Sequence, residues 1–177
     1  DIPAMWLRDS AAQVWPYLHL MPQDSDLRIM VEGLLRRMSH SILIDPYANA
    51  FLHNPTCLNT EYEADDTTML PGVYERKWEV DSLAYVLRLS AGYWNVTRTT
   101  EPFDDAWVRA IRLILDTFEV QRGSRARDVY MFQRHTSIAT DSLPNEGRGN
   151  PGKPCGLIRS AFRCSDDSTI FPYLIPS

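Results

Sequence analysis

Three short segments of the chain combine charged and aromatic residues in patterns that helical amphipathicity does not explain. They are residues 5–10 (MWLRDS), 74–82 (YERKWEVDS) and 159–168 (RSAFRCSDDS), the first, second and third charged segments. Each places an Asp just before an apolar helical pattern, where a helix N-terminus favours an ionised carboxylate. An aromatic ring can stack on a sugar while Arg and Asp bind its hydroxyls. Together the segments predict a carbohydrate site, although any one Asp alone could simply cap a helix.

The adjacent carboxylates of Asp166 and Asp167 could provide acid catalysis at this site. Two neighbouring carboxylates disfavour joint ionisation, so one of them can stay protonated near neutral pH. A protonated carboxyl is what a general acid requires. The structural alternative is that an Arg beside an Asp, as in Arg8-Asp9, forms a surface ion pair worth at most about 1 kcal/mol.

Sequence motifs for other chemistries are absent. The four His residues lack the H-x-x-x-H and H-E-x-x-H spacings of a zinc site, and Asp65-Asp66 lacks the alternating oxygen ligands of a calcium loop. We expect His19 and His40 to lie on helix surfaces and Asp65-Asp66 to form a solvated acidic turn. No G-x-S-x-G, P-loop or G-x-G-x-x-G motif occurs. The sequence therefore predicts no metal and no cofactor.

The composition is that of a globular chain without basic character. Its 177 residues include 18 Lys and Arg against 23 Asp and Glu, a formal net charge of −5, and 44% are hydrophobic. This length fits a single domain, and the acidic balance argues against a nucleic-acid partner. No apolar run approaches the roughly 20 residues that span a bilayer, so no membrane partner is expected. Both ends resemble the interior of a folded protein, which predicts that residues 1–177 are part of a larger domain.

Three Cys residues and one glycosylation triplet bear on the cellular compartment. Cys57, Cys155 and Cys164 are too few and too scattered for a disulfide scaffold, and the pairing of any two of them is open. Asn95-Val96-Thr97 is an acceptor sequence for N-glycosylation, which matters only in a secretory protein and which also arises by chance.

Apolar residues at helical spacing predict three long helices. The first should lie between a cap at Asp24 or Ser25 and Asp45-Pro46, the second should run from Val80 to near Asn95, and the third should lie between a cap at Thr99 or Thr100 and Gly123. The apolar stripes are Leu27, Met30, Val31, Leu34, Leu35 and Met38; Val80, Leu83, Ala84, Leu87, Ala91 and Trp94; and Trp107, Ile111, Ile114, Leu115 and Phe118.

We expect a further helix over residues 9–20, in which Pro16 either causes a kink or lies in the first turn. The long segments 45–77 and 122–156 carry several aromatic residues, so we expect ordered loops, with a short strand at 129–133. Helices separated by long loops fit either a helical barrel with a site at one end or an irregular bundle.

The charged segments also make the chain recognisable. Four motifs together resemble glycoside hydrolase family 125, and the resemblance covers essentially the whole chain. In chain order they are DIPAMWLRDSAAQVWPYL, DPYANAF, ERKWEVDSLAYVL and SAFRCSDDSTIFPYLIPS. The resemblance implies an all-α fold, an (α/α)6 barrel, with residues 1–177 forming an incomplete N-terminal part of the catalytic domain with long loops. It further implies a metal-independent, inverting exo-α-1,6-mannosidase that removes terminal mannose from α-mannosides such as N-glycan-type chains.

Residue by residue, the resemblance implies that Asp166 is the general acid. It also implies a set of side chains that bind the terminal mannose: Trp6 as a stacking platform, with Arg8, Asp9, Asp81, Arg163 and Asp167. The family's general base is a Glu in a His-Glu-Ser-Phe type motif far downstream, which this chain lacks, so residues 1–177 alone are expected to be inactive. An inverting glycosidase holds its two carboxyl groups about 6.5 to 9.5 Å apart, which adjacent residues are not expected to supply.

The chain departs from the family pattern before the Ser-Asp-Asp sequence, where Cys164 replaces a Pro. This change makes the turn less rigid or introduces a disulfide. The length and composition of residues 122–154 favour a fungal source. The substrate class and the Asn95 triplet predict a secreted protein or one of the secretory pathway. A non-catalytic carbohydrate-binding protein with the same helical fold is the alternative, and the downstream Glu would distinguish the two.

Overall fold

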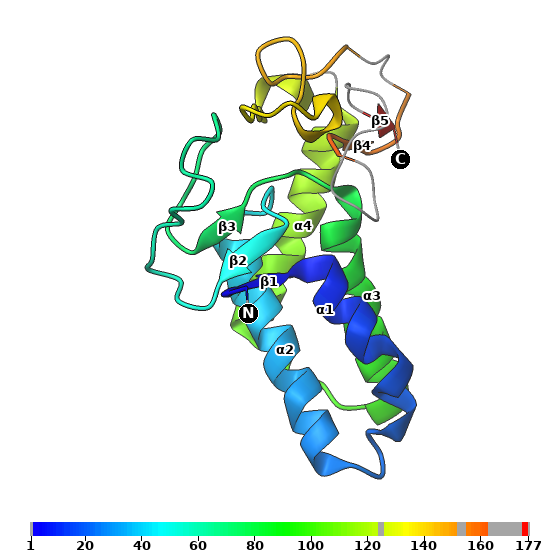
Figure 1. Cartoon of the computed structure of the whole chain (residues 1–177). Coiled ribbons are helices and arrows are strands. Elements are labelled where there is room, and N and C mark those ends of the chain that lie inside the picture. The colour runs from blue at the N-terminus through cyan, green and yellow to red at the C-terminus, as the bar shows by residue number, and fades with distance from the viewer. Residues whose placement is uncertain (1, 124–125, 152–154, 163–174, 177) are drawn as a thin grey trace.

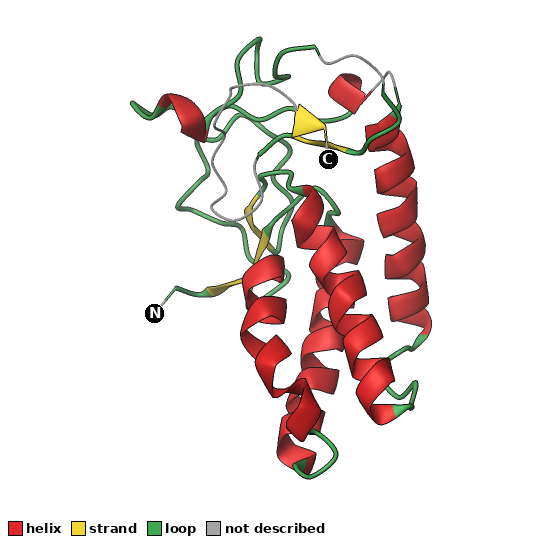
Figure 2. Ribbon diagram, turned by 90° about the vertical axis from the view of Figure 1, so that its right-hand side faces the viewer, coloured by secondary structure: helices red, strands yellow, loops and turns green. Residues whose placement is uncertain are grey.

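The computed structural model describes residues 2–123, 126–151, 155–162 and 175–176, without the side chains of Arg127, Ile175 and Pro176. In this part of the chain four α-helices run alongside one another, and short strands and long loops gather towards one end (Figure 1, Figure 2). The helices are α1 (Leu7–Val14), α2 (Ser25–Ile44), α3 (Val80–Thr97) and α4 (Asp105–Arg122). Helix α1 packs on α3, and α2 packs on α4. The predicted helical class is confirmed.

Two long helices begin at an Asp side chain that caps them. The carboxylate of Asp24, one of the two caps predicted for α2, accepts a 2.9 Å hydrogen bond from the backbone N–H of Leu27. Helix α4 is capped by Asp104, which accepts at 2.9 Å from the N–H of Trp107. The predicted cap at Thr99 or Thr100 is wrong because Thr99 closes a turn before the helix, accepting at 3.2 Å from the N–H of Glu101.

Pro16 divides the helix predicted over residues 9–20. Helix α1 ends at Val14, and the chain continues as the 3-10 helix η1 (Trp15–Leu20) with Pro16 in its first turn. Proline lacks the N–H that an α-helix would require in its interior, whereas the first turn tolerates it.

The core lies between the helices and under the loops, and α3 presents a different face to it from the one predicted. The buried apolar residues of α3 are Leu83, Val86, Leu89 and Tyr93. Of the predicted stripe, Ala84, Ala91 and Trp94 are exposed. Apolar residues occupy more than one face of this helix, so periodicity alone chose the wrong one. The predicted face borders an open apolar groove of about 300 Å³ lined by Leu87, Ser90, Ala91, Trp94, Phe103, Trp107 and Ile111.

A small antiparallel sheet connects the N-terminus to the loops. It consists of β1 (Ala4–Trp6), β2 (Ala50–Leu52) and β3 (Val73–Glu75), in the order β1-β2-β3. Met5 pairs with Phe51, and Ala50 with Glu75. Strand β1 runs directly into α1, and the N–H of Leu7 donates to the carbonyl of Asn49 at 3.0 Å. The sheet therefore fixes where α1 begins.

The remaining described elements lie in the C-terminal part of the chain. They are η2 (Ala126–Asp128), η3 (Ala139–Asp141), β4 (Arg159–Ser160) and β5 (Ile175–Pro176), with β4 and β5 paired antiparallel. The strand predicted at 129–133 is wrong: within this range only Gln133 forms a β-bridge, to Asp66. Residues 129–132 form a loop that is anchored by two buried aromatic rings, Tyr130 and Phe132.

Candidate active site

The second and third charged segments meet at Trp78. This side chain is buried, and its indole N–H donates to the carbonyl of Arg159 at 2.8 Å. In return, the backbone N–H groups of Ala161 and Phe162 donate to the carbonyl of Trp78 at 3.1 and 3.0 Å. The N–H of Val80, at the start of α3, donates to the hydroxyl of Ser160 at 3.1 Å. The start of the third segment is thus fixed against the N-terminus of α3.

The first and second segments meet at Arg8. Its guanidinium lies 3.1 Å from a carboxylate oxygen of Asp9 and 3.8 Å from one of Asp81. Asp9 lies in the first turn of α1 and Asp81 in the first turn of α3, as the sequence predicted. Both helices have their N-termini at this point, and the free N–H groups of the first turn favour negative charge. One guanidinium therefore contacts two carboxylates that come from different helices.

A shallow pocket of about 310 Å³ opens beside this contact. It is lined by Trp6, Arg8, Asp9 and Gln13. The Trp6 ring meets the ring of Tyr74 edge-on, with 5.4 Å between their centroids, and this contact holds one side of the pocket. Half of the Asp9 side chain is exposed, whereas Asp81 is buried behind Arg8. A partly exposed indole beside a guanidinium and a carboxylate can stack on a sugar ring and bind its hydroxyls.

Three of the predicted site residues lie outside the described part of the chain: Arg163, Asp166 and Asp167. Cys164 lies outside it as well, while Cys57 and Cys155 are exposed and not disulfide-bonded. The last described residue before them is Phe162, whose ring is fully buried against Phe132 and lies 5.3 Å from the ammonium of Lys77. The structure therefore fixes the point from which the segment with the two carboxylates departs.

Beneath the site lies a buried ionic network that the sequence analysis missed. At its centre is Glu75, which is only 3% exposed. Its carboxylate accepts hydrogen bonds from Arg134 and from the amide of Asn49, both at 2.9 Å, and lies 3.6 Å from the ammonium of Lys77. Burial by itself would raise the pKa of Glu75, but Lys77, Asn49 and Arg134 together outweigh it, so the pKa lies below its ordinary value.

Arg134 connects this network to two loops. Its guanidinium donates to both carboxylate oxygens of Asp65, at 2.8 and 2.6 Å, and lies 3.6 Å from the carboxylate of Asp141, which also bonds Lys77. Burial works to lower the pKa of Arg134, but Asp65 and Glu75 raise it further than burial lowers it. The predicted solvated turn is wrong for Asp65, which is buried by this pair, although Asp66 is exposed.

A second buried group supports the backbone of the second segment from behind. The guanidinium of Arg76 donates to Asp45 at 2.6 Å and lies over the rings of Tyr47 and Tyr130, 5.5 and 5.3 Å from their centroids. The Tyr130 hydroxyl donates to the carbonyl of Arg76 at 2.8 Å and accepts from the N–H of Trp78 at 3.0 Å. Burial raises the pKa of Tyr130, so the phenol stays protonated and keeps donating. The loop that follows α4 thus holds residues 76–78 in place.

The family model described as "Metal-independent alpha-mannosidase (GH125)" matches residues 1–177. The chain belongs to glycoside hydrolase family 125. The fold brings together the described residues of the four motifs that resemble this family.

Two relatives agree with the family assignment. The meiotically up-regulated gene 157 protein of Schizosaccharomyces pombe is 36% identical over 192 residues, an alignment that covers 100% of this chain and 38% of the relative. A Streptococcus pneumoniae structure of the "metal-independent alpha mannosidases", in a "non-productive substrate complex with alpha-1,6-mannobiose", is 42% identical with a TM-score of 0.89. That alignment covers 99% of this chain and 41% of the other. The chain thus spans about two fifths of the length of these two proteins.

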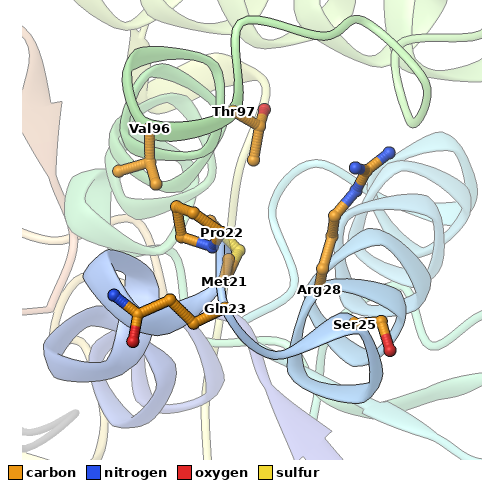
Figure 3. A pocket seen from close by; sticks show the side chains of 7 residues that line it. All are labelled: Met21, Pro22, Gln23, Ser25, Arg28, Val96 and Thr97. Atoms are coloured by element: carbon orange, nitrogen blue, oxygen red, sulfur yellow. The ribbon is translucent and has the colours of Figure 1, made fainter.

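Other features of the described residues do not resemble a glycosidase site. A cavity of about 340 Å³ lies where the turn before α2 meets the end of α3, and Met21, Pro22, Gln23, Ser25, Arg28, Val96 and Thr97 line it (Figure 3). None of these lining residues is a carboxylate, and Arg28 is paired with Glu32 at 2.9 Å.

In the described part of the chain, no three His, Cys, Asp or Glu side chains gather as metal ligands, and no helix is long and apolar enough to cross a membrane.

Proposed function

We propose that the complete protein containing this chain is an inverting exo-α-1,6-mannosidase that works without a metal. One observation carries the proposal: Arg8 contacts the carboxylates of Asp9 and Asp81 beside a pocket walled by Trp6. This is the arrangement that the family resemblance assigns to the terminal mannose. The family description and the mannobiose complex of the Streptococcus pneumoniae protein support the substrate class.

In the proposed mechanism the described residues bind and orient the sugar. Trp6 stacks on the apolar face of the terminal mannose, and the partly exposed carboxylate of Asp9 accepts hydrogen bonds from its hydroxyls. Asp81, buried behind Arg8, acts on the sugar by holding that guanidinium in place. Arg8 fixes both carboxylates, so their geometry is set before the substrate arrives. Arg163 and Asp167 would complete this binding set.

The chemical step uses two carboxyl groups. Asp166, protonated, donates its proton to the glycosidic oxygen as the bond to the anomeric carbon breaks. A Glu that follows residue 177 removes a proton from the water that attacks the opposite face of the ring. Inversion requires about 6.5 to 9.5 Å between the two carboxyl groups, so that the water fits between base and sugar. Adjacent residues such as Asp166 and Asp167 are not expected to supply this separation, so the proposal takes the base from another part of the protein.

The test is hydrolysis of α-1,6-mannobiose by the complete protein, followed by proton NMR from the first seconds. We expect β-mannose as the first product, unchanged rates in EDTA, and no hydrolysis by residues 1–177 alone. Initial release of α-mannose would contradict inversion, and loss of activity in EDTA would contradict the metal-free mechanism. Tight binding of mannobiose without hydrolysis would instead identify a carbohydrate-binding protein of the same fold.

We also propose that the protein acts in the secretory pathway or outside the cell. The Streptococcus pneumoniae relative is described in connection with the processing of N-linked glycans, and such glycans are built and trimmed in secretory compartments of eukaryotes. Cell fractionation tests this proposal. Epitope-tagged complete protein should be recovered with secretory membranes or in the medium, and its recovery in the cytosol would contradict the proposal.

A further inference from the structure

Asn95 occupies an accessible position at the end of α3. It lies in the last turn of the helix, which ends at Thr97 and is followed by Arg98 in the left-handed conformation, with φ of 56°. The Asn95 side chain is exposed and makes no hydrogen bond to any described residue. Thr97 donates its hydroxyl to the carbonyl of Tyr93 at 2.9 Å. The acceptor amide is therefore free to react, and the short stretch of helix that presents it is at a terminus, where helices fray.

This end of α3 lies away from the candidate site. Helix α3 runs from the strands and loops at its N-terminus to the turn between η1 and α2 at its C-terminus (Figure 1, Figure 2). Val96 and Thr97 accordingly line the cavity formed with that turn, as Figure 3 shows. A large group attached to Asn95 would leave the pocket of Trp6 and Arg8 open.

A groove of about 290 Å³ starts at Asn95 itself. Its other lining residues are Trp15, Leu18 and His19 of η1, and Gly92 and Val96 of α3. Gly92 lets η1 pack closely on α3, since a Cβ there would lie 2.6 Å from the Trp15 ring. The guanidinium of Arg88 lies over the same ring, 4.1 Å from its centroid, and holds it in place. The result is a fixed apolar floor with one His at its rim.

We propose that Asn95 carries an N-linked glycan whose first N-acetylglucosamine lies in this groove. In the attachment step the amide nitrogen of Asn95 forms a bond to C1 of the sugar and loses a proton. The C1–O bond to the pyrophosphate of a lipid-linked oligosaccharide breaks, and the lipid pyrophosphate leaves. An N-acetylglucosamine has an apolar ring face and an acetamido methyl group, which suit the Trp15 and Leu18 floor. Its hydroxyls can bond His19.

Mass spectrometry of the complete protein, expressed from its own gene in a yeast, tests the attachment. We expect a peptide in which Asn95 carries two N-acetylhexosamines and several hexoses, and we expect the Asn95→Gln variant to lack that modification. The matched control is Asn59→Gln, an Asn outside any acceptor triplet, which should leave the glycopeptide unchanged. Recovery of the protein with Asn95 unmodified overturns the proposal.

Two glycosidases test the groove. Endoglycosidase H leaves one N-acetylglucosamine on the Asn, whereas peptide N-glycosidase F removes the whole glycan and leaves an Asp. If the first sugar packs in the groove, the endoglycosidase product should keep the Tm of the untreated protein, and the fully deglycosylated product should melt about 2 °C lower. The Asn95→Asp variant should have the Tm of the fully deglycosylated product. In the Trp15→Leu variant the two products should have equal Tm values. Equal Tm values for both products of the wild type would overturn the groove contact.

Discussion

The guanidinium of Arg8 lies 3.8 Å from the carboxylate of Asp81, which joins the N-terminal turns of α1 and α3 at a single charged contact. Arg8 also contacts Asp9 at 3.1 Å, so its two sides face two carboxylates at once. All three side chains are at least partly buried, and a buried charge without its partner is far more costly than an exposed one. Any change at Arg8 should therefore alter both carboxylates together.

The first prediction concerns this contact. Replacing Arg8 with Lys keeps the charge but loses the planar fork that can face two carboxylates. We expect kcat/KM on α-1,6-mannobiose to fall by about 30-fold, equivalent to about 2 kcal/mol of transition-state binding. Arg28→Lys is the matched control: it removes the Arg fork of a pair with Glu32 at the other end of the helices, and it should leave kcat/KM within about twofold.

The same pair can be examined by a double-mutant cycle. Asp81→Asn should also lower kcat/KM, and the double variant should lose less than the product of the two single losses, because each single change disrupts the same contact. Strict additivity, or single variants with wild-type activity, would show that Arg8 and Asp81 do not act together on the substrate.

The second prediction concerns Glu75 and pH. Because the folded-state pKa of Glu75 lies below its ordinary value, its charge stabilises the fold above the unfolded pKa of about 4.3, and this contribution disappears as the pH falls through the lower, folded pKa. Glu75→Gln should therefore lower the free energy of unfolding by about 3 kcal/mol at pH 7, with a difference that shrinks below about pH 4. Denaturant unfolding across this pH range measures it.

Glu119→Gln is the control for Glu75. Glu119 pairs with Arg122 on the surface of α4, and its side chain is 74% exposed. Its removal should change the free energy of unfolding by no more than a few tenths of a kcal/mol at any pH. A Glu75→Gln effect of the same small size, or one that grows on acidification, would contradict the role of the buried network.

The third prediction concerns the hydroxyl of Tyr130. Tyr130→Phe leaves the N–H of Trp78 and the carbonyl of Arg76 without that partner in a buried place, so we expect a loss of about 1 to 3 kcal/mol in the free energy of unfolding. Tyr17→Phe removes the same hydroxyl from an exposed ring on η1 and should change little. Equal effects of the two substitutions would show that water satisfies the groups near Trp78.

The sequence predicted the helices better than their faces. The first long helix was predicted between a cap at Asp24 or Ser25 and Asp45-Pro46, and the structure has it at Ser25–Ile44 with Asp24 as the cap, because capping residue and apolar spacing agree there. On α3 the spacing fits two stripes, and only tertiary packing decides that Val86, Leu89 and Tyr93 face the core while Trp94 stays exposed. The three-residue strands β1, β2 and β3 were missed because so short a segment carries no clear alternation of apolar and polar residues.

The candidate site was predictable where local chemistry is unusual and was missed where it depends on distant partners. Trp6, Arg8 and Asp9 share one short motif, and the structure shows them around one pocket. Glu75 and Arg134 meet only through the fold, since their contact joins the end of β3 to a loop beyond α4. The signal that could have revealed them is the run of charges at Glu75, Arg76 and Lys77 directly after apolar residues, which favours burial with partners over exposure.

The last prediction concerns Asp166, which the proposal makes the general acid. On α-1,6-mannobiose the leaving group is a sugar hydroxyl that needs a proton, so Asp166→Asn should lower the rate by about 10² to 10⁴-fold. On an aryl mannoside with an acidic phenol as leaving group, protonation matters little and the same change should cost far less.

Asp167→Asn is the matched control because it removes the same charge from the neighbouring residue. If Asp167 binds the sugar or tunes its neighbour, both substrates should lose activity to a similar extent. Steady-state kinetics of the two variants on the two substrates separate the roles. Equal losses on both substrates for Asp166→Asn would remove the acid role, because a general acid is required in proportion to the basicity of the leaving group.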